Sequence, residues 1–527
     1  GWHHPAVSAT LFHNGRIHIG GRISAEALVA RDGRVAAIGT AADLRREHSD
    51  AERVDLRGGL MTPGWHDAHV HFTWWAIQMD QVDLRDAASV DAALIRIEAY
   101  AQLLPVGAWV LGGRFDKNRW GRWPTAAELD RVTGGRPAAL RSRDGHARWL
   151  NTDALRRAGI DASTTVPAGG AIERDASGAP TGILKENANS LADAVVPPPT
   201  IDDSFAAIER GQREAHRRGI TAIEDLEVAA AFSAFQRRRD RGELRLRVAM
   251  GIPHANLDAA LRLGLRTGLG DEWLRTGHLK IFTDGALGSQ TAALEEPYEG
   301  SSDRGLLTIE PDRLNTDVRR AADAGIAVAI HAIGDRAVHV ALDAIEPTRA
   351  AHPELRQRVE HVQLLRRQDI GRFGALDIIA SMQPIHATSD RDLVDRYWGP
   401  ERATRAYPWR HLLDRGARLA FGSDAPVEPI DPLLGMHAAV ARKRPHDADR
   451  WHPEQALDVH EAIAAYTSGA AYAMGAESER GTLAVGMRCD ATVVERDLAA
   501  IAVDEWPALR ITGTVVGGNV VHAAGIG

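Results

Sequence analysis

The sequence predicts an α/β protein: a (β/α)₈ barrel with a small β-sandwich domain built from both termini and an inserted α+β lobe after the first barrel strand. Three observations predict this fold class. Short apolar runs alternate with helical patterns through the middle of the chain, hairpin signals lie at both ends, and one stretch is too long for a single crossover. The 527 residues are enough for one large barrel with attached units.

The two ends of the chain have the pattern of short strands joined by tight turns. Asn14-Gly15 and Asp32-Gly33 separate apolar runs near the start, and Gly517-Gly518 does so near the end. Neither end has enough strands to bury a core alone. We therefore expect residues 1–60 and 476–527 to meet in one β-sandwich.

Eight apolar runs between these ends predict the barrel strands. Helical patterns such as Asp202 to Arg218, Asp312 to Ala324 and Pro408 to Arg415 precede such runs, and this alternation is typical of parallel βαβ units. Eight is the number of strands that closes a barrel, which we assign to residues 61–475. The runs are Leu60 to Phe72, Thr221 to Leu226, Leu246 to Ile252, His278 to Thr283, Ala327 to Ala332, Arg358 to Leu364, Ile378 to Pro384 and Arg418 to Gly422.

The stretch from residue 74 to residue 200 is too long for one crossover between neighbouring strands. It has strand patterns of its own at Trp109 to Arg114 and Ala138 to Arg143, and a hairpin around Asp175 to Pro180. Pro197-Pro198-Pro199 marks its return to the barrel. We expect this stretch to form a lobe over the barrel mouth.

Composition excludes several classes of protein. With 44% hydrophobic and 25% charged residues the chain is neither disordered nor fibrous, and the formal charge of −8 provides no basic face for nucleic acid. No apolar run approaches the roughly 20 residues of a membrane span. The opening Gly1-Trp2-His3-His4 lacks a secretory pattern, so we expect a signal to be absent or removed and the location to be cytoplasmic. We expect a small-molecule substrate, and the assembly that we consider is a homodimer.

Polar side chains stand near the carboxyl ends of several predicted strands. His69 and His71 lie two residues apart, so both can face one ion, although the pair alone fits a solvated strand edge equally well. The single cysteine, Cys489, leaves metal binding to His, Asp, Glu or a modified side chain. Barrel active sites collect residues from several strand ends, so one site for two divalent ions can hold all six candidates. They are His69, His71, Lys280, His331, His361 and Asp424.

Lys280 is the unusual member of this set, because an ammonium group cannot bind a cation. The chain has only four lysines, and one inside an apolar strand needs a reason. Burial lowers the pKa of a lysine, and the neutral amine can then form a carbamate with carbon dioxide, whose two oxygens can bridge two metals. Glu186, in the lobe, is the alternative ligand. It is equally suited to contact substrate or to stand exposed in the first turn of a helix.

At these residues the sequence resembles the amidohydrolase superfamily, and most closely the branch typified by N-substituted formamide deformylase. The resemblance extends over nearly the whole chain. The motifs that carry it are Thr62 to His71, Leu111 to Asp116 with Trp120 and Pro124, Arg143 to Ala147, Lys280 to Ser289, His331 to Asp335, Glu360-His361, Gly422 to Val427 and Gly481 to Ala491.

The resemblance implies a metal-dependent hydrolase on a TIM barrel that cleaves a non-peptide carbon–nitrogen bond, in an amide or an N-substituted formamide. One or two Zn²⁺ ions, or another divalent metal, would activate water. Asp424 would contact a metal and move the proton, and Lys280 would be the candidate carbamate. The metal ligands would be His69, His71, His331, His361, Lys280 and Asp424.

Further residues are candidates for contact with substrate. His146 is a candidate for polarising the carbonyl, and a structural role in the lobe is equally expected. The lobe holds six of the 13 tryptophans, which fit a core better than a pocket, and Phe72 to Trp75 is bulkier than expected after His71. The candidate substrate contacts are Glu186, Trp74, Trp75, Trp120 and Asp284.

Two other functions stay open at the level of sequence. The first is a ring-amine deaminase of the same superfamily. A sequence that resembles those enzymes has a glutamate shortly after the fifth-strand histidine, whereas here His331 is followed by Ala332 to Asp335. A non-catalytic, metabolite-binding barrel is the other alternative, but the complete set of ligands argues against a degraded enzyme.

Overall fold

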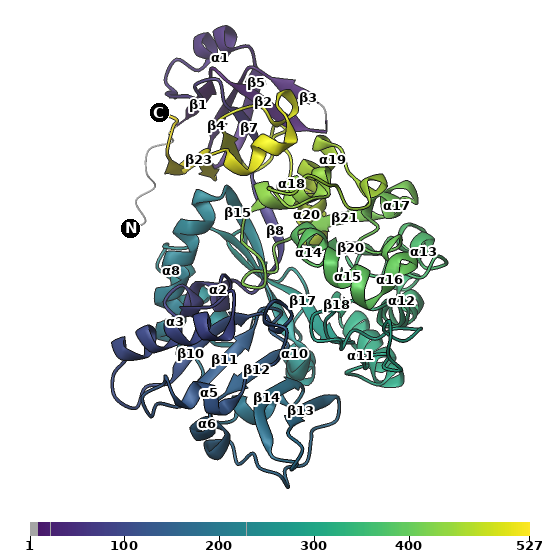
Figure 1. Cartoon of the computed structure of the whole chain (residues 1–527). Coiled ribbons are helices and arrows are strands. Elements are labelled where there is room, and N and C mark those ends of the chain that lie inside the picture. Colours follow the sequence, from purple (N-terminus) through teal and green to yellow (C-terminus); the bar gives the residue numbers. More distant parts are fainter. Residues whose placement is uncertain (1–8, 22, 228) are drawn as a thin grey trace.

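The computed structural model describes residues 9–21, 23–227 and 229–527. The opening residues, on which the expectation about a secretory signal rests, lie outside these ranges. The described chain forms a barrel, a two-sheet β domain and an α+β lobe, which is the predicted fold class, and the β domain and the lobe lie at opposite ends of the barrel (Figure 1). Among the described residues, no helix combines the length and apolar character that a transmembrane segment needs.

The barrel is an eight-stranded sheet in which each strand pairs in parallel with the next along the chain. The first and last strands meet where they end: the Asp424 N–H donates to the His69 carbonyl at 2.8 Å, and the His71 N–H donates to the Ala425 carbonyl at 2.9 Å. Closure therefore brings Asp424 beside both histidines. The strands are β8 (Trp65–Val70), β15 (Ile220–Asp225), β16 (Arg247–Pro253), β17 (Leu274–Phe282), β18 (Val328–Ala332), β19 (Arg358–His361), β20 (Ile379–Met382) and β21 (Arg418–Phe421).

Helices pack around the barrel and bury an apolar face against it. In α8, Thr200 caps the first turn by accepting from the Asp203 N–H, and Ala207, Ile208 and Ala215 are buried. The three helices predicted above lie within one residue of their expected ends. The helices after the lobe are α8 (Ile201–Arg217), α9 (Ala229–Asp240), α10 (Leu257–Leu263), α11 (Pro311–Asp323), α12 (Asp335–Arg349), α13 (Ile370–Ala375), α14 (Pro384–Ser389), α15 (Arg391–Tyr397), α16 (Gly399–Ala403), α17 (Trp409–Asp414), α18 (Pro432–Ala441), α19 (Val459–Tyr466) and α20 (Ser468–Ala473).

Both ends of the chain contribute strands to the β domain. Its four-stranded sheet has the order β5-β4-β1-β6, and its six-stranded sheet has the order β24-β23-β22-β7-β2-β3. The C-terminal strand β22 pairs with the N-terminal strand β7. The elements are β1 (Thr10–His13), β2 (Arg16–Gly20), β3 (Ile23–Ala25), β4 (Ala27–Arg31), β5 (Arg34–Gly39), α1 (Ala41–Glu47), β6 (Glu52–Asp55), β7 (Leu60–Pro63), β22 (Ala491–Val494), β23 (Ile511–Val516) and β24 (Asn519–Ala523).

The apolar run Leu60 to Phe72, expected as one barrel strand, is divided at Gly64. Leu60–Pro63 belongs to the β domain and Trp65–Val70 to the barrel. A Cβ on Gly64 would lie 2.3 Å from the Thr221 Oγ1, so only glycine lets the chain pass β15 at this point. Because hydrophobicity is continuous across Gly64, the apolar pattern did not reveal the division.

A buried ion pair joins the β domain to the barrel. Arg247 of β16 donates through Nη2 to the Asp490 Oδ1 at 2.9 Å, and its Nε also pairs with this carboxylate. Burial raises the pKa of Asp490, but the charge and hydrogen bonds of Arg247, together with the Gly517 N–H and Arg480, outweigh burial and hold the pKa below its usual value. The charged pair thus fixes the segment before β22 against the amino end of a barrel strand.

The lobe is built on a sheet with the order β13-β14-β12-β11-β10-β9. It contacts the barrel through Asn118, whose Nδ2 donates to the Gly288 carbonyl at 3.2 Å. The lobe therefore covers the carboxyl ends of the barrel strands. Its elements are α2 (Phe72–Gln78), β9 (Val82–Asp83), α3 (Val90–Leu103), β10 (Val110–Phe115), α4 (Lys117–Trp120), α5 (Ala126–Asp130), β11 (Ala138–Ser142), β12 (Ala147–Leu150), α6 (Thr152–Arg157), β13 (Gly170–Arg174), β14 (Pro180–Glu186) and α7 (Asn189–Asp193).

Candidate metal centre

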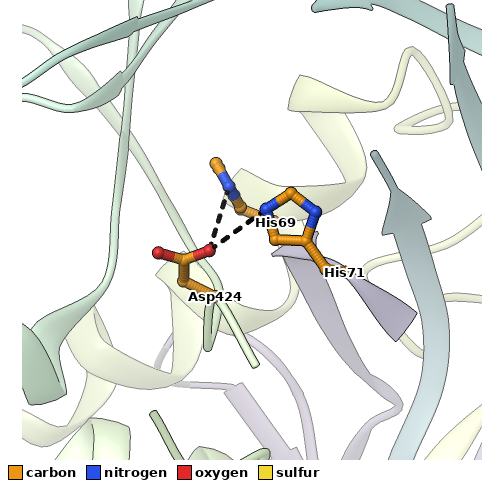
Figure 2. Close-up of side chains that lie close together, drawn as sticks. All are labelled: His69, His71 and Asp424. Carbon is orange, nitrogen blue, oxygen red and sulfur yellow. Dashed lines mark ion pairs between the residues drawn. The ribbon is translucent and has the colours of Figure 1, made fainter. Parts of the chain in front are cut away.

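Two histidines and an aspartate converge where the first and last barrel strands end (Figure 2). The Asp424 Oδ1 lies 3.4 Å from the His69 Nε2 and 3.6 Å from the His71 Nε2. The ligand atoms of the three residues all lie within 4.8 Å of one another. Two ligands at zinc bonding distance in a tetrahedral site are about 3.3 Å apart, so this spacing suits a shared ion.

A second group of potential ligands shares Asp424. The His386 Nε2 lies 3.2 Å from the Asp424 Oδ2, and His361 completes the group within 4.8 Å. The ring centroids of His361 and His331 are 4.5 Å apart, and those of His361 and His69 are 4.8 Å apart. The four histidines expected from the sequence therefore converge. His386, in α14, was not among the expected residues.

Each of these four imidazoles is held by a partner on one ring nitrogen, which leaves the other nitrogen for an ion. Such partners fix the tautomer and the orientation of metal-binding histidines. The contacts are His69 Nδ1 with Glu360 Oε2 at 2.5 Å, His71 Nδ1 with Glu227 Oε1 at 3.2 Å, His361 Nδ1 with Gln383 Oε1 at 2.8 Å and His331 Nε2 with the Gly285 carbonyl at 3.0 Å.

Lys280 lies in β17, buried inside the barrel. Among the described residues, its Nζ and the His69 Nε2 have no hydrogen-bond partner. Buried polar atoms almost always have a hydrogen-bond partner, so these two atoms need an explanation, and a bound cation with its ligands provides one. Burial lowers the pKa of Lys280 to about 8, which leaves part of the amine neutral near neutral pH. The residues present thus fit a divalent metal.

The charge states around the centre suit metal binding. Burial lowers the pKa of His331 and His361 well below the usual value, so both rings are neutral, the form that binds a metal. Burial raises the pKa of Asp424, but the neighbouring imidazoles, His69 first, outweigh burial and hold it well below the usual value. The centre therefore combines neutral imidazoles with a charged carboxylate.

Glu360 is a functional candidate that sequence reasoning missed. In an extended strand, Glu360 and His361 would face opposite sides of the sheet. His361 has a φ of +73°, which ends the extended geometry, and both neighbouring side chains contact His69. Glu360 also pairs with the Arg358 Nε at 2.6 Å. The signal in the sequence was an acidic residue next to a candidate ligand inside an apolar run.

We expect Glu360→Gln to weaken metal affinity about 10- to 100-fold, the usual effect of losing a partner of a metal-binding histidine. The amide keeps the size of the side chain but removes the charge that holds the His69 Nδ1. Competition with a chelating dye measures the affinity. Glu296→Gln, at a side chain that is 77% exposed, is the matched control and should not change it. Equal affinities in both variants would contradict a role for Glu360.

A cavity of about 680 Å³ opens above the centre. His331, His361 and Asp424 line it from the barrel, and Phe115 and His146 line it from the lobe. Pockets of this size take small-molecule ligands. The lobe thus forms one wall of the cavity through which a small molecule would reach the candidate ligands.

His146 and Glu186 form a pair at the lobe side of this cavity. The His146 Nδ1 lies 2.8 Å from the Glu186 Oε2, and the Thr291 Oγ1 donates to the Glu186 Oε1 at 2.5 Å. Burial lowers the pKa of His146, but the charge and hydrogen bond of Glu186, together with the charges of Asp144 and Asp284, outweigh burial and raise the pKa to about 9. Glu186 therefore lies beside His146, outside both groups of potential metal ligands.

The other expected substrate contacts lie outside the cavity lining. Trp74 packs edge-on against His71 with the ring centroids 5.7 Å apart, and Trp75 packs against Phe72 in a hydrophobic core. Trp120 stacks on Phe115 and donates to the Ala87 carbonyl at 2.9 Å. The Asp284 carboxylate accepts from the N–H groups of Ala293, Ile333 and Gly334. Trp123, which the sequence did not distinguish from its neighbours, does line the cavity.

Comparisons with known proteins match the chain to one family. The model of the amidohydrolase family matches residues 52–522. The putative amidohydrolase YtcJ of Bacillus subtilis is 33% identical over 513 residues, 94% of this chain and 96% of that one. N-substituted formamide deformylase of Arthrobacter pascens is 30% identical over 514 residues, 94% of each chain. The crystal structure of an uncharacterized metal-dependent hydrolase from Pyrococcus horikoshii has a TM-score of 0.78 and 29% identity, covering 94% of this chain and 99% of that one.

Proposed function

The chain belongs to the amidohydrolase family, and from this premise we propose that it hydrolyses a non-peptide carbon–nitrogen bond, in an amide or an N-substituted formamide. The observation that carries the proposal is the convergence of His69, His71 and Asp424 (Figure 2), of which Asp424 also lines the cavity. The similarity to a formamide deformylase over 94% of the chain supports this choice of bond.

The proposed ligands come from five barrel strands or the segments directly after them. We propose that one or two Zn²⁺ ions bind here, because imidazole and carboxylate groups are suitable ligands for zinc. Lys280, with its lowered pKa, would hold metal as a carbamate, and we prefer it to Glu186 because Glu186 contacts His146 and lies outside both groups of potential ligands. A divalent cation held here supplies Lewis acidity that polarises a carbonyl and lowers the pKa of water toward about 7. The ligands are His69, His71, His331, His361, Lys280 and Asp424.

Asp424 is the proposed general base and acid. Its carboxylate takes a proton from the attacking water as the oxygen bonds to the carbonyl carbon, and returns that proton to the leaving nitrogen as the carbon–nitrogen bond breaks. The products are a carboxylic acid, formic acid for a formamide, and an amine. His386 lies 3.2 Å from the Asp424 Oδ2 and orients the carboxylate. Burial lowers the pKa of His386, but Asp424, together with Asp390 and Glu428, outweighs burial and raises it, so this ring can donate to the Asp424 carboxylate.

His146 is proposed to stabilise the carbonyl oxygen as negative charge develops on it. It lines the cavity from the lobe, and its pKa of about 9 keeps the ring positively charged at neutral pH. A charged donor fixed in a site that excludes water is an effective stabiliser of an oxyanion. Glu186 holds the ring through its Nδ1 and leaves the Nε2 for substrate.

The two alternative functions have less support. The acidic residue after His331 is Asp335, which accepts the Glu295 N–H at 2.9 Å and does not line the cavity. A ring-amine deaminase would need this acid in the cavity. A non-catalytic barrel would have no use for the complete arrangement of ligands and Asp424.

A panel of substrates tests the reaction class. We expect metal-loaded protein to release amine from N-benzylformamide or related amides, and not ammonia from cytosine or adenine. Amine release is measured with a fluorogenic amine reagent and ammonia with a coupled assay. Release of ammonia alone would favour the deaminase. Binding of the panel with no turnover of any member would favour the non-catalytic barrel.

A further inference from the structure

Most charged side chains that line the cavity are already paired. Arg143 forms an ion pair with Glu428, and Arg444 lies 2.6 Å from an Asp392 carboxylate oxygen. Arg119 donates to the Arg85 carbonyl at 3.2 Å. The two ion pairs neutralise Arg143 and Arg444, and the hydrogen bond to a carbonyl holds the Arg119 side chain without neutralising its charge.

Lys117 and Arg396 are the exceptions. Both line the cavity, and within the described parts of the chain neither side chain has an ion pair within 4.0 Å or a hydrogen bond. Their recorded contacts are with aromatic rings. The Lys117 Nζ lies 5.3 Å from the ring centroid of Trp123, and both cations lie over Tyr397.

Tyr397 brings the two cations together. Its ring centroid lies 5.8 Å from the Lys117 Nζ and 5.0 Å from the Arg396 Cζ. Its hydroxyl donates to the Asn118 Oδ1 at 3.0 Å, and Asn118 also binds the Gly288 carbonyl. Lys117 belongs to the lobe and Arg396 to α15 of the barrel. The contacts of Asn118 therefore hold the two sides of this pair in a fixed relation.

The surroundings of Lys117 favour the arrival of an anion. Burial disfavours its charge, as does the neighbouring ammonium of Lys185, and both lower its pKa. A desolvated cation without a counterion is costly, and an anion relieves that cost. The carboxylates of Asp144 and Asp116 favour the Lys117 charge but act less strongly than burial, and neither forms an ion pair with it: Asp116 accepts the Asn118 N–H at 2.8 Å, and Asp144 accepts the His146 N–H at 3.1 Å.

We propose that Lys117 and Arg396 form a specificity subsite for an anionic group, a carboxylate, at the end of the substrate away from the amide. The proposal rests on the function proposed above and adds the substrate class: amides that carry an acid. Trp123 and Phe115 line the same cavity and offer apolar contact to the part of the substrate that joins the acid to the amide. Arg143 and Arg444 do not serve this role, because protein carboxylates already neutralise them.

Two probes that differ only in the acid test the subsite: 4-(formamidomethyl)benzoate and N-benzylformamide. Calorimetric affinities are measured on metal-loaded protein with Asp424→Asn, which prevents turnover, with and without Lys117→Met and Arg396→Gln. We expect the acid to bind about tenfold more tightly than the neutral probe, and this ratio to fall toward one when both cations are replaced. Lys443→Met is the matched control, because Lys443 pairs with Asp504 and does not line the cavity.

The outcomes separate the subsite from the reaction. A preference for the acid that disappears when Lys117 and Arg396 are replaced supports the subsite. If the protein with Asp424 intact cleaves neither probe, the proposed reaction fails, but the subsite is still supported. Equal affinity for the two probes, no binding of the acid, or a preference that survives both substitutions overturns the subsite. Turnover of N-benzylformamide would then leave the proposed reaction standing.

Discussion

Removing metal from the protein should abolish hydrolysis, and adding Zn²⁺ should restore it. The chain's own groups then lack the Lewis acid that makes water a nucleophile at neutral pH. Stability should fall as well, because a ligand that binds only the folded state stabilises it by about 2.7 kcal/mol when present at 100 times its dissociation constant. Metal content by mass spectrometry, turnover and the thermal midpoint are measured together before and after dialysis against a chelator.

The matched control is dialysis against the same chelator saturated with Zn²⁺, which should change none of the three readings. The Lys280 Nζ and the His69 Nε2, which have no hydrogen-bond partner among the described residues, explain why the metal-free centre should also be less stable. Full turnover in protein shown to be free of metal would contradict both the proposed cofactor and the reaction assigned to it.

Asp424→Asn should reduce turnover about 10²- to 10⁴-fold, the usual contribution of general acid–base catalysis, and keep metal bound. The amide keeps the size of the side chain but cannot accept the proton of the attacking water. A structural role as a helix cap does not account for Asp424, because the next helix, α18, begins at Pro432 and is capped by Asp431. Steady-state kinetics and metal content per chain are the measurements.

Asp431→Asn is the matched control for this variant. It changes the same functional group in the segment that follows β21, and asparagine caps a helix nearly as well as aspartate, so turnover should stay unchanged. An Asp424→Asn protein with normal turnover and an unchanged pH profile would exclude the proposed base, whatever its metal content.

The strand-end residues could be predicted because their signals are local. Each lies near the carboxyl end of an apolar run, and the parallel strands of a closed barrel bring those ends together. This reasoning predicted His331, His361 and Asp424 as candidate ligands without any knowledge of which residues are neighbours across the sheet. The same reasoning did not reach His386, which lies in a helix after β20 and approaches Asp424 only because β20 and β21 are adjacent.

Substrate contacts were harder to predict, because a tryptophan has the same local pattern in a core and in a pocket. Trp75 is buried in one hydrophobic cluster, and Trp120 and Trp123 both pack against another, but of these three only Trp123 also lines the cavity. Asp284 follows β17, as a ligand would, but its carboxylate binds three backbone N–H groups of neighbouring loops. Which of these side chains faces the cavity depends on the packing of the lobe against the barrel.

The sequence by itself determined the fold class, the family and the strand ends from which the candidate ligands come, since periodicity, turn residues and motif spacing are properties of neighbours along the chain. Only the tertiary structure decided which atoms meet. The left-handed backbone at His361 lets Glu360 and His361 both contact His69, and the packing of α15 against the lobe brings Arg396 near Lys117. Such contacts join residues far apart in the chain, and their distances depend on backbone angles and packing that no local pattern specifies.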